Sequence, residues 1–457
     1  MKAFLGSRWV RKLRFGVGPI VLSLAATTAQ AANLLVYNTN DSGAGSLRQA
    51  IANNATMGGG NTIIFSNVVT GTITLTTDTL WISNNVTILG PGPNVLAVDG
   101  SASYTVFRLS GNQTVSLTGL TVTNGGASGI INYGSLTVSN CTIINCVASS
   151  SIIGSLAGGI GNNGALTVIA STIANNSGGG IYNILGTVAL LDSSLTGNSG
   201  GALFNNGGGV TVTASTISGN SGGGISNFGS GSFFGNPVTA TLTISASTFS
   251  GNSGGGIGNG ALAGGVATVQ ISDTILKAGA SGANIGNNGG TITSQGYNLS
   301  SDNGGGFLTA TGDQINTDPM LGSLADNGGP TPTIALKAGS PAIDKGKSFG
   351  ITTDQRGQLR YDNPNIVNAT GGDGADIGAY EAAELRIVNA QKTGNHLRLD
   401  FLSWLGTNYE VQSRADMVTG NWASLPGSTP GNGGIASTTV SNAFNQSQQF
   451  YRIHPAP

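Results

Sequence analysis

Few side chains in this sequence are suited to acid–base or metal chemistry. Glycoside hydrolysis requires a pair of carboxylates, and polysaccharide lyases need a base, together with carboxylates that hold a metal. The chain has no glutamate before Glu381, and its two histidines are His396 and His454. Most of the chain therefore lacks the residues that these reactions use most.

The long middle of the chain is almost free of charge. Between residues 101 and 272 the only charged side chains are Arg108 and Asp192, which the repeat described below places several coils apart. Because a catalytic pair must lie within hydrogen-bond reach of one substrate, these two do not form one. The sequence predicts that the protein is not an enzyme and has no catalytic, cofactor-binding or metal-binding residue.

Aspartates gather instead between residues 302 and 376. Oxygen-rich turns suit Ca²⁺, but aspartate beside glycine also forms turns on its own. The spacing matches neither an EF-hand nor a repeat-in-toxin motif, so turn formation is the favoured interpretation and calcium binding stays open. The eight residues are Asp302, Asp313, Asp318, Asp326, Asp344, Asp354, Asp373 and Asp376.

Two sets of threonines recur at the spacing of the repeat. Facing outward, they would form hydroxyl ladders that order water or bind a glycan or ice. The plainer interpretation is that threonine is a good strand former. The first set is Thr142, Thr172, Thr216 and Thr248, and the second is Thr137, Thr167, Thr211 and Thr243.

Aromatic residues near the C-terminus are a further candidate site. Tyr409, Trp422, Phe450 and Tyr451 are a candidate carbohydrate platform, but their alternating strand positions favour packing in a core. We expect Trp404 and Trp422 to be core residues.

An internal repeat positions the residues in the middle of the chain, among them the threonines. Each copy has an apolar–x–apolar run, then small or polar residues, then another apolar residue, and a second element reads apolar–x–Asn. The most frequent step is 22 residues, with insertions such as 229–237. The final apolar residues are Ile143, Ile173, Leu195, Ile217 and Phe249, and the second elements end at Asn162, Asn183, Asn205, Asn227, Asn259 and Asn287.

A repeat unit of this length buries its apolar face only by stacking on its neighbours. Strands then pair in parallel between coils about 4.8 Å apart, which predicts an all-β fold, a right-handed parallel β-helix. We expect the asparagines to occupy left-handed turns and to form side-chain ladders. Cys141 shares a column with Ser171, which favours a packed free thiol, although a secreted chain permits a disulfide with Cys146.

Composition and charge narrow the classes of protein. Glycine accounts for 76 residues and charged residues for 8% of the chain, which excludes an ordinary helical protein. The hydrophobic content of 39% is too high for a disordered chain. Without its first 31 residues the chain has 13 basic and 19 acidic residues, a net charge of −6, which argues against nucleic acid as a partner.

The N-terminus has the pattern of a secretory signal. Five basic residues, Lys2, Arg8, Arg11, Lys12 and Arg14, precede a short apolar run over 15–26, and a small-x-small cleavage site ends at Ala31. The run is too short to span a bilayer, and no later segment is a transmembrane candidate. We predict a signal peptide over 1–31 and a secreted or outer-surface location. Residues 32–64, with a short amphipathic helix after Ser46, are expected to cap the stack.

Two short motifs resemble those of known families. The stretch NTNDSGAGSLRQAI over 38–51 looks like the N-terminal cap of secreted, pectate-lyase-like β-helix proteins. Phe249 and Asn252 form an F-x-x-N element similar to that of polymorphic outer membrane protein repeats. The second resemblance implies a β-helical adhesin on a bacterial cell surface.

A longer resemblance covers roughly 296–381. Ordered segments of this region together resemble the choice-of-anchor Q domain of bacterial surface proteins, a domain without an agreed enzymatic activity. The resemblance therefore implies a location more than a mechanism. The segments are 296–302, 318–333, 339–344, 353–357 and 376–381.

Alternating strands return after residue 384 and predict a small β-sandwich. The predicted organisation is a signal peptide (1–31), a cap (32–64), β-helix repeats (65–295), a choice-of-anchor Q-like region that completes the stack (296–383) and the sandwich (384–457). We predict a non-catalytic structural or adhesion protein, with glycans or surface proteins as candidate partners. A carbohydrate-binding extracellular protein is the alternative, and a polysaccharide lyase or hydrolase is the least favoured one.

Overall fold

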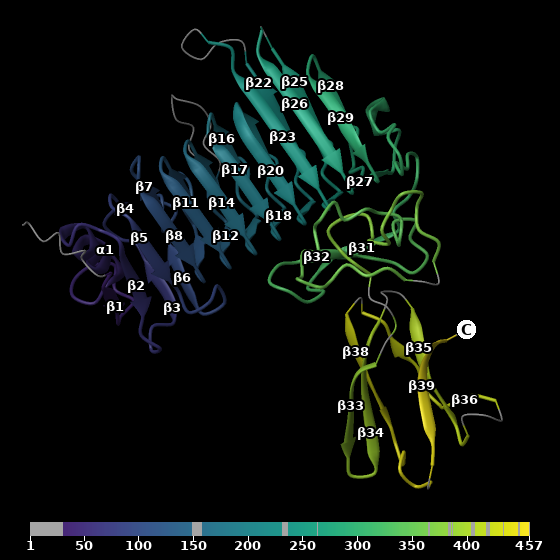
Figure 1. The fold of residues 1–457 in the computed structure, drawn as a ribbon. Coiled ribbons are helices and arrows are strands. Elements are labelled where there is room, and N and C mark those ends of the chain that lie inside the picture. The colour runs from purple at the N-terminus through teal and green to yellow at the C-terminus, as the bar shows by residue number, and fades with distance from the viewer. Residues whose placement is uncertain are drawn as a thin grey trace, which may run out of the picture.

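The structure is a computed structural model that describes residues 31–456, except 149–157, 231–235, 263, 364–365, 383–384, 386, 404–406, 417–420, 433 and 447. The predicted signal peptide, up to residue 30, and Trp404 lie outside the described residues. Three long parallel sheets wind into a right-handed β-helix, which is followed by a folded-back segment and a small antiparallel sandwich (Figure 1). The predicted fold class is confirmed.

The β-helix has three faces, named here sheets A, B and C, and successive coils add one strand to each. Sheet A contains β1 (Asn33–Val36), β2 (Asn61–Phe65), β5 (Val86–Leu89), β8 (Thr114–Thr118), β11 (Ser135–Ser139), β14 (Ala165–Ile169), β17 (Thr187–Leu191), β20 (Gly208–Thr213), β23 (Thr239–Ser245), β26 (Val266–Ser272) and β29 (Thr291–Gly296). Sheet B contains β3 (Gly71–Thr74), β6 (Leu96–Asp99), β9 (Thr121–Thr123), β12 (Thr142–Ile144), β15 (Thr172–Ala174), β18 (Ser194–Thr196), β21 (Thr216–Ser218), β24 (Thr248–Ser250), β27 (Ile275–Lys277) and β30 (Leu299–Ser300). Sheet C contains β4 (Leu80–Ile82), β7 (Phe107–Leu109), β10 (Ile130–Asn132), β13 (Ile160–Asn162), β16 (Ile181–Ile184), β19 (Leu203–Asn206), β22 (Ile225–Gly229), β25 (Ile257–Ala261) and β28 (Ile285–Asn288).

Apolar columns fill the interior of the β-helix. In sheet B, Ile143, Ile173, Leu195, Ile217 and Phe249 pair in register from strand to strand, and each is at most 1% exposed. Burying a side chain of this size contributes about 1.5–3 kcal/mol, and stacking repeats that gain in every coil. The column predicted from the repeat is confirmed.

A ladder of asparagines, buried as far as Asn259, runs along sheet C. Each Nδ2 donates to the Oδ1 of the next asparagine at 2.6–3.0 Å, from Asn132 to Asn287. The ladder is confirmed and begins one coil earlier than predicted. The expected left-handed conformation is wrong, because these asparagines lie in strands, and positive φ values occur at other asparagines such as Asn140 and Asn175.

A second column lies where the chain passes from sheet A to sheet B. The backbone N–H of Cys141 donates to Ser171 Oγ at 3.0 Å, and that of Ser171 donates to Ser193 Oγ at 3.1 Å. The Cys146 N–H donates to Asn176 Oδ1 at 3.0 Å and so begins a second asparagine ladder. Both cysteines are buried and free, as predicted for packed thiols.

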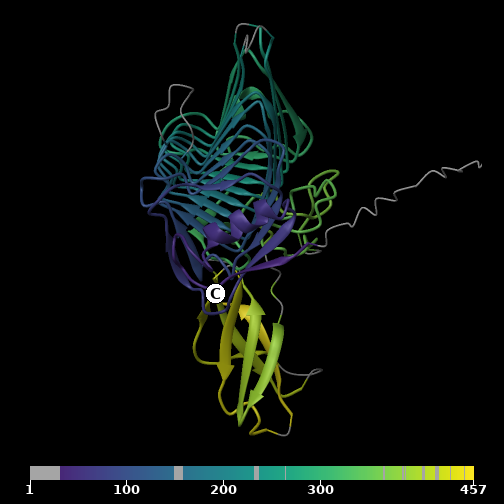
Figure 2. The same cartoon turned by 90° about the vertical axis from the view of Figure 1, so that its left-hand side faces the viewer.

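The helix α1 (Leu47–Thr56) covers the N-terminal end of the solenoid (Figure 2). Its N-cap residue Ser46 accepts a hydrogen bond from the Gln49 N–H at 3.2 Å, and Leu47 and Ile51 are buried. A helix in this place shields strand edges that would otherwise be open to pairing. The short amphipathic helix predicted after Ser46 is confirmed.

The stack ends sooner than predicted. β29 and β30 are the last strands of sheets A and B. The chain from residue 301 to 382 first packs Leu308 into the core at this end of the stack and then folds back beside sheet B (Figure 1). This folded-back segment contains the turn η1 (Gly304–Gly306) and a hairpin of β31 (Leu321–Ala325) and β32 (Thr333–Leu336). The region expected to complete the stack therefore does so only through its first residues.

The two predicted threonine columns differ in exposure. Thr216 and Thr248, on sheet B, are 0% and 1% exposed because the folded-back segment covers them. Thr211 and Thr243, on sheet A, face solvent. The outward ladder predicted for the first set is thus wrong where the segment lies, and the second set remains on an open face.

The C-terminal module is a sandwich of two antiparallel sheets. One contains β33 (Ile387–Thr393), β34 (His396–Leu402) and β38 (Ile435–Val440), and the other contains β35 (Asn408–Arg414), β36 (Ala423–Ser424), β37 (Thr429–Pro430) and β39 (Phe450–Pro455). Phe401 and Tyr409 meet edge to face between the sheets, with ring centroids 5.2 Å apart. The module extends to one side of the β-helix (Figures 1 and 2).

Candidate functional site

The folded-back segment is held to sheet B by a buried amide. Gln355 Oε1 accepts a hydrogen bond from Thr216 Oγ1 at 2.6 Å, and its Nε2 donates to Ser194 Oγ at 2.8 Å and to Thr331 Oγ1 at 2.9 Å. The Ala379 N–H donates to Thr248 Oγ1 at 3.0 Å. The outward hydroxyls of sheet B therefore hold this segment in place.

The eight aspartates of the segment all accept backbone N–H groups. Five of them bond to the N–H two residues ahead, which is the geometry of an aspartate-initiated turn. The turn interpretation is confirmed. Among the described residues no group of three or more His, Cys, Asp or Glu is placed to hold a metal ion.

A charge cluster is buried between the segment and the last coils. Arg360 Nη1 lies 3.5 Å from Glu381 Oε2 and 3.7 Å from Asp273 Oδ2, and none of these side chains is more than 3% exposed. Arg360 also donates to the carbonyl oxygens of Asp376 and Gly378, both at 2.8 Å. One guanidinium thus joins a residue of the β-helix to two parts of the segment.

Burial dominates the electrostatics of this cluster. It raises the pKa of Glu381 to about 7, and it raises the pKa of Asp273 well above its ordinary value. The pKa of Asp376 is also raised well above its ordinary value, first by burial and then by the charge of Glu381. Glu381 accepts the N–H groups of Tyr361 and Asp376 at 2.9 and 3.0 Å, so both of its oxygens are engaged by the fold.

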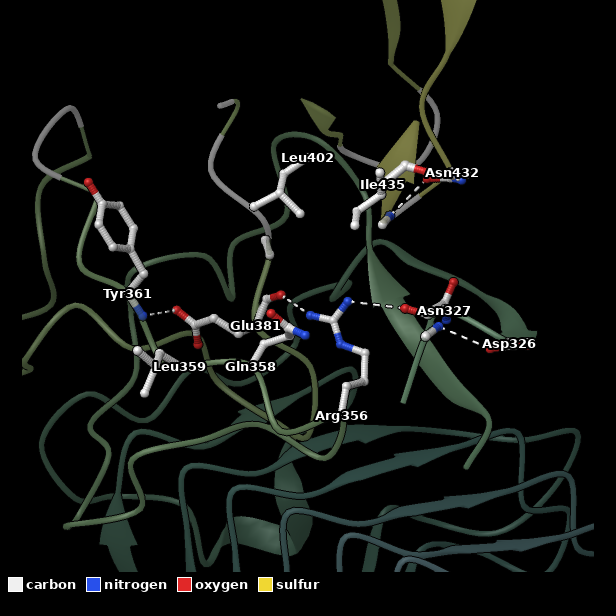
Figure 3. Close-up of a pocket in the computed structure, with 13 residues that line it drawn as sticks. Asp326, Asn327, Arg356, Gln358, Leu359, Tyr361, Glu381, Leu402, Asn432 and Ile435 are labelled. Carbon is white, nitrogen blue, oxygen red and sulfur yellow. Dashed lines mark hydrogen bonds between the residues drawn. The ribbon is translucent and has the colours of Figure 1, made fainter. Parts of the chain in front are cut away.

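A cavity of about 510 Å³ opens between the segment and the C-terminal module (Figure 3). Arg356 forms its floor and donates to Asp354 Oδ2 at 2.8 Å, to Glu381 O at 2.6 Å and to Asn327 O at 3.4 Å. Leu402 and Ile435 of the module approach it from the opposite side. These acceptors already engage the guanidinium of Arg356, so its charge is compensated by the fold. The side chains that face it from the module, Leu402 and Ile435, are apolar.

Sheet C carries a stack of aromatic rings on its outer face. Tyr182 and Phe204 lie 4.9 Å apart between ring centroids with planes 14° from parallel, and Phe204 and Phe228 lie 5.6 Å apart at 20°. Tyr182 and Phe204 are register partners in β16 and β19, whereas Phe228 is paired with Asn206 and reaches Phe204 diagonally from β22. The sequence places Tyr182 and Phe204 at the same position of the repeat, because both are the middle residues of apolar–x–Asn elements. That this position faces outward follows only from the strand geometry.

A second aromatic group lies nearer the N-terminal end of sheet C. Arg108, in β7, has its guanidinium carbon 4.7 Å from the ring centroid of Trp81 and 5.5 Å from that of Tyr133. Trp81 is 51% exposed and Tyr133 is 41% exposed. We call these three residues the Arg108 cluster.

The two charged residues of the middle of the chain are separated, as predicted. Arg108 lies in β7 of sheet C, whereas Asp192 follows β17, the strand that comes directly after β16 in the chain. Two further strands of sheet C, β10 and β13, lie between β7 and β16. Asp192 lies beside the folded-back segment, where its carbonyl oxygen accepts from Thr331 Oγ1 at 3.0 Å. Burial, with a contribution from Asp354, raises its pKa to about 6.

The predicted aromatic platform of the C-terminal module is only partly exposed. Tyr409 is 2% exposed and belongs to a core cluster, and Tyr451 packs against another. Trp422 is half-buried between the guanidinium groups of Arg414 and Arg452, at 5.1 and 4.6 Å from its ring. Packing in the module, the favoured interpretation, is therefore confirmed for the two tyrosines.

The described part of the chain contains no helix long and apolar enough to cross a membrane. The two histidines lie on different sheets of the sandwich, His396 in β34 and His454 in β39, and both are exposed.

Comparison with known proteins gives fold neighbours only. No family model and no curated protein matches the chain, so the resemblances to polymorphic outer membrane protein repeats and to the choice-of-anchor Q domain remain predictions. A solved structure of pectate lyase Pel9A is 13% identical over 77% of this chain and 97% of its own, with a TM-score of 0.44. Another, ORF18 of Geobacillus virus E2, is 10% identical over 89% of this chain and 76% of its own, with a TM-score of 0.36. At identities and TM-scores this low, neither neighbour bears on what this chain does.

Proposed function

We propose that this chain is a non-catalytic protein of the extracellular space or outer cell surface, and that its β-helix displays binding surfaces. The observation that carries the proposal is the use of its charged groups. The carboxylates that cluster, Glu381, Asp273 and Asp376, are buried with Arg360 and bonded to backbone groups. Such groups hold the segment in place, and their burial makes them inaccessible to a substrate.

Secretion remains part of this proposal and rests on the N-terminal sequence. Export would remove residues 1–31 and leave Ala32 as the first residue. The intact mass of the exported protein tests this directly, because retention of the basic segment would give a larger mass.

The function itself is tested by incubating the exported chain with a panel of soluble polysaccharides. Size-exclusion chromatography then measures the length of each polymer before and after incubation. Unchanged lengths across the panel support a non-catalytic role. Shortening of any polymer, absent after heat denaturation of the protein, would contradict it and return the polysaccharide lyase or hydrolase alternative to first place.

Carbohydrate binding is the second candidate, and the aromatic face of sheet C favours it. Rings presented on a rigid sheet with few charged side chains provide apolar surface with few competing hydrogen-bond partners. A surface protein of this kind would hold a glycan without changing it, which is compatible with the first proposal.

A further inference from the structure

The Arg108 cluster differs from the other strongly held arginines of the chain. Arg360 and Arg356 are buried and bonded to carboxylates. Arg108, by contrast, has no carboxylate and no hydrogen-bond acceptor among the described residues, and its guanidinium lies against the rings of Trp81 and Tyr133. A half-buried guanidinium is thus left with its N–H donors unused by the fold.

The two rings also hold this side chain in place. Trp81 and Tyr133 contact the guanidinium from neighbouring coils through cation–π interactions. These interactions use none of its N–H groups as hydrogen-bond donors, so the donors remain available to a ligand. Because the Arg108 side chain is already held in one position, binding an anion would carry a smaller cost in conformational entropy.

The surroundings of the cluster indicate the kind of ligand. Trp81 and Tyr133 are about half exposed and present apolar ring surface beside the cation. The aromatic stack lies farther along the same sheet, with Tyr182, Phe204 and Phe228 on β16, β19 and β22. Between the two groups, the outward-facing residues Ile131 and Gly161 of β10 and β13 are buried. From β4 to β22 is six inter-strand steps of about 4.8 Å, or roughly 29 Å, so a ligand that contacts both aromatic groups is an extended chain.

We propose that the outer face of sheet C binds a polysaccharide that carries carboxylate or sulfate groups. Arg108 donates hydrogen bonds to the anionic group, and the rings of Trp81 and Tyr133 pack against the sugar that bears it. Both anions accept paired N–H donors, the geometry in which arginine exceeds lysine. This inference rests on the proposed function, because the polymer is held on the sheet and is not cleaved.

The test is affinity electrophoresis of the full chain, without its predicted signal peptide, in gels that contain alginate, dextran sulfate or dextran. Alginate supplies carboxylates and dextran sulfate supplies sulfates, while dextran is the uncharged counterpart of the latter. The variants are Arg108→Gln, Arg108→Lys, Trp81→Ala and the control Lys277→Gln. Lys277, in β27 of sheet B, pairs with Asp318 of the folded-back segment, so its substitution removes the same charge from another face. Circular dichroism and thermal unfolding verify that each variant is folded.

We expect binding to at least one anionic polymer and little to dextran, and the polymer that binds identifies the anion. Arg108→Gln should weaken binding by at least about tenfold, the loss expected for charge-assisted hydrogen bonds. Arg108→Lys should recover only part of it, Trp81→Ala should also weaken it, and Lys277→Gln should leave it within about twofold. Equal effects of Arg108→Gln and Lys277→Gln, equal binding to dextran, or no binding to either anionic polymer overturns the proposal. Shortening of a bound polymer would instead contradict the non-catalytic function and leave the site in place.

Discussion

Gln355 accepts a 2.6 Å hydrogen bond from the hydroxyl of Thr216, a residue 139 positions earlier in the chain. This contact joins the folded-back segment to sheet B, and neither partner is exposed. Gln355 also donates to Ser194, so one amide side chain spans two coils of the β-helix. The attachment of the segment thus depends on buried polar groups, which are costly to leave unpaired.

Replacing Gln355 with alanine is expected to loosen the segment. The change leaves the hydroxyls of Thr216 and Ser194 without their partner, at a cost of about 1–3 kcal/mol for each unpaired group. Hydrogen–deuterium exchange across 301–382 should accelerate while the strands of sheet A keep their protection. Gln358→Ala is the matched control, because Gln358 is exposed. Equal exchange in the two variants would show that the amide does not hold the segment.

The asparagine ladder should respond strongly at its centre. Asn205→Ala removes the acceptor of Asn183 and the donor to Asn227, which lie 2.7 and 2.8 Å away. We expect the free energy of unfolding in urea to fall by about 2–5 kcal/mol. Asn206→Ala alters the next residue, which points outward in the same strand, and should change it by less than about 0.5 kcal/mol. Similar losses in both variants would contradict a stabilising role for the ladder.

The two thiols should be unreactive in the folded protein. Burial raises the pKa of Cys141 and of Cys146 to about 11, and the thiolate is the reactive form. With a thiol-specific colour reagent at pH 8, the native chain is expected to release almost no colour. In denaturant it should release two equivalents. Rapid reaction of either thiol without denaturant would show that its column opens to solvent.

Stability should depend on pH through the buried acids. Glu381 has a pKa of about 7 in the folded chain, against an ordinary value of 4.5. Between these values the folded state holds more protons than the unfolded state, so the free energy of unfolding falls as pH rises from about 4.5 to about 7. Asp273 and Asp376 act in the same direction, because their pKa values are also raised.

Urea unfolding at several pH values across this window measures the slope. Glu381→Gln cannot titrate and should flatten the slope, while the remaining buried aspartates keep part of it. Glu410→Gln is the control, because the pKa of Glu410 is lowered by hydrogen bonds from Ser424 and Gln412 and Glu410 contributes below the window. An unchanged slope in Glu381→Gln, or stability that rises with pH in the parent chain, contradicts this account.

Local pattern accounts for the β-helix and its ladders. The column through Ile143, Ile173 and Leu195 follows from the repeat, because in-register parallel pairing places equivalent residues above one another. The packed state of Cys141 follows from the same argument. These features depend on neighbours one coil away, which the period already specifies.

The candidate sites depend on contacts that the period does not specify. The burial of Thr216 comes from Gln355, far along the chain, and nothing in the repeat indicates that the segment turns back. Likewise, Trp81, Arg108 and Tyr133 belong to three different strands or turns and come from irregular early coils. Their juxtaposition follows from the strand register of sheet C, which requires the structure.

The most direct test of the central claim is a glycan array in which each bound spot is then analysed by mass spectrometry. The account predicts selective binding to glycans with anionic sugars, and unchanged masses at every spot after prolonged incubation. A spot whose glycan has lost mass, with the intact glycan preserved under heat-denatured protein, would contradict the claim that this chain binds without catalysis.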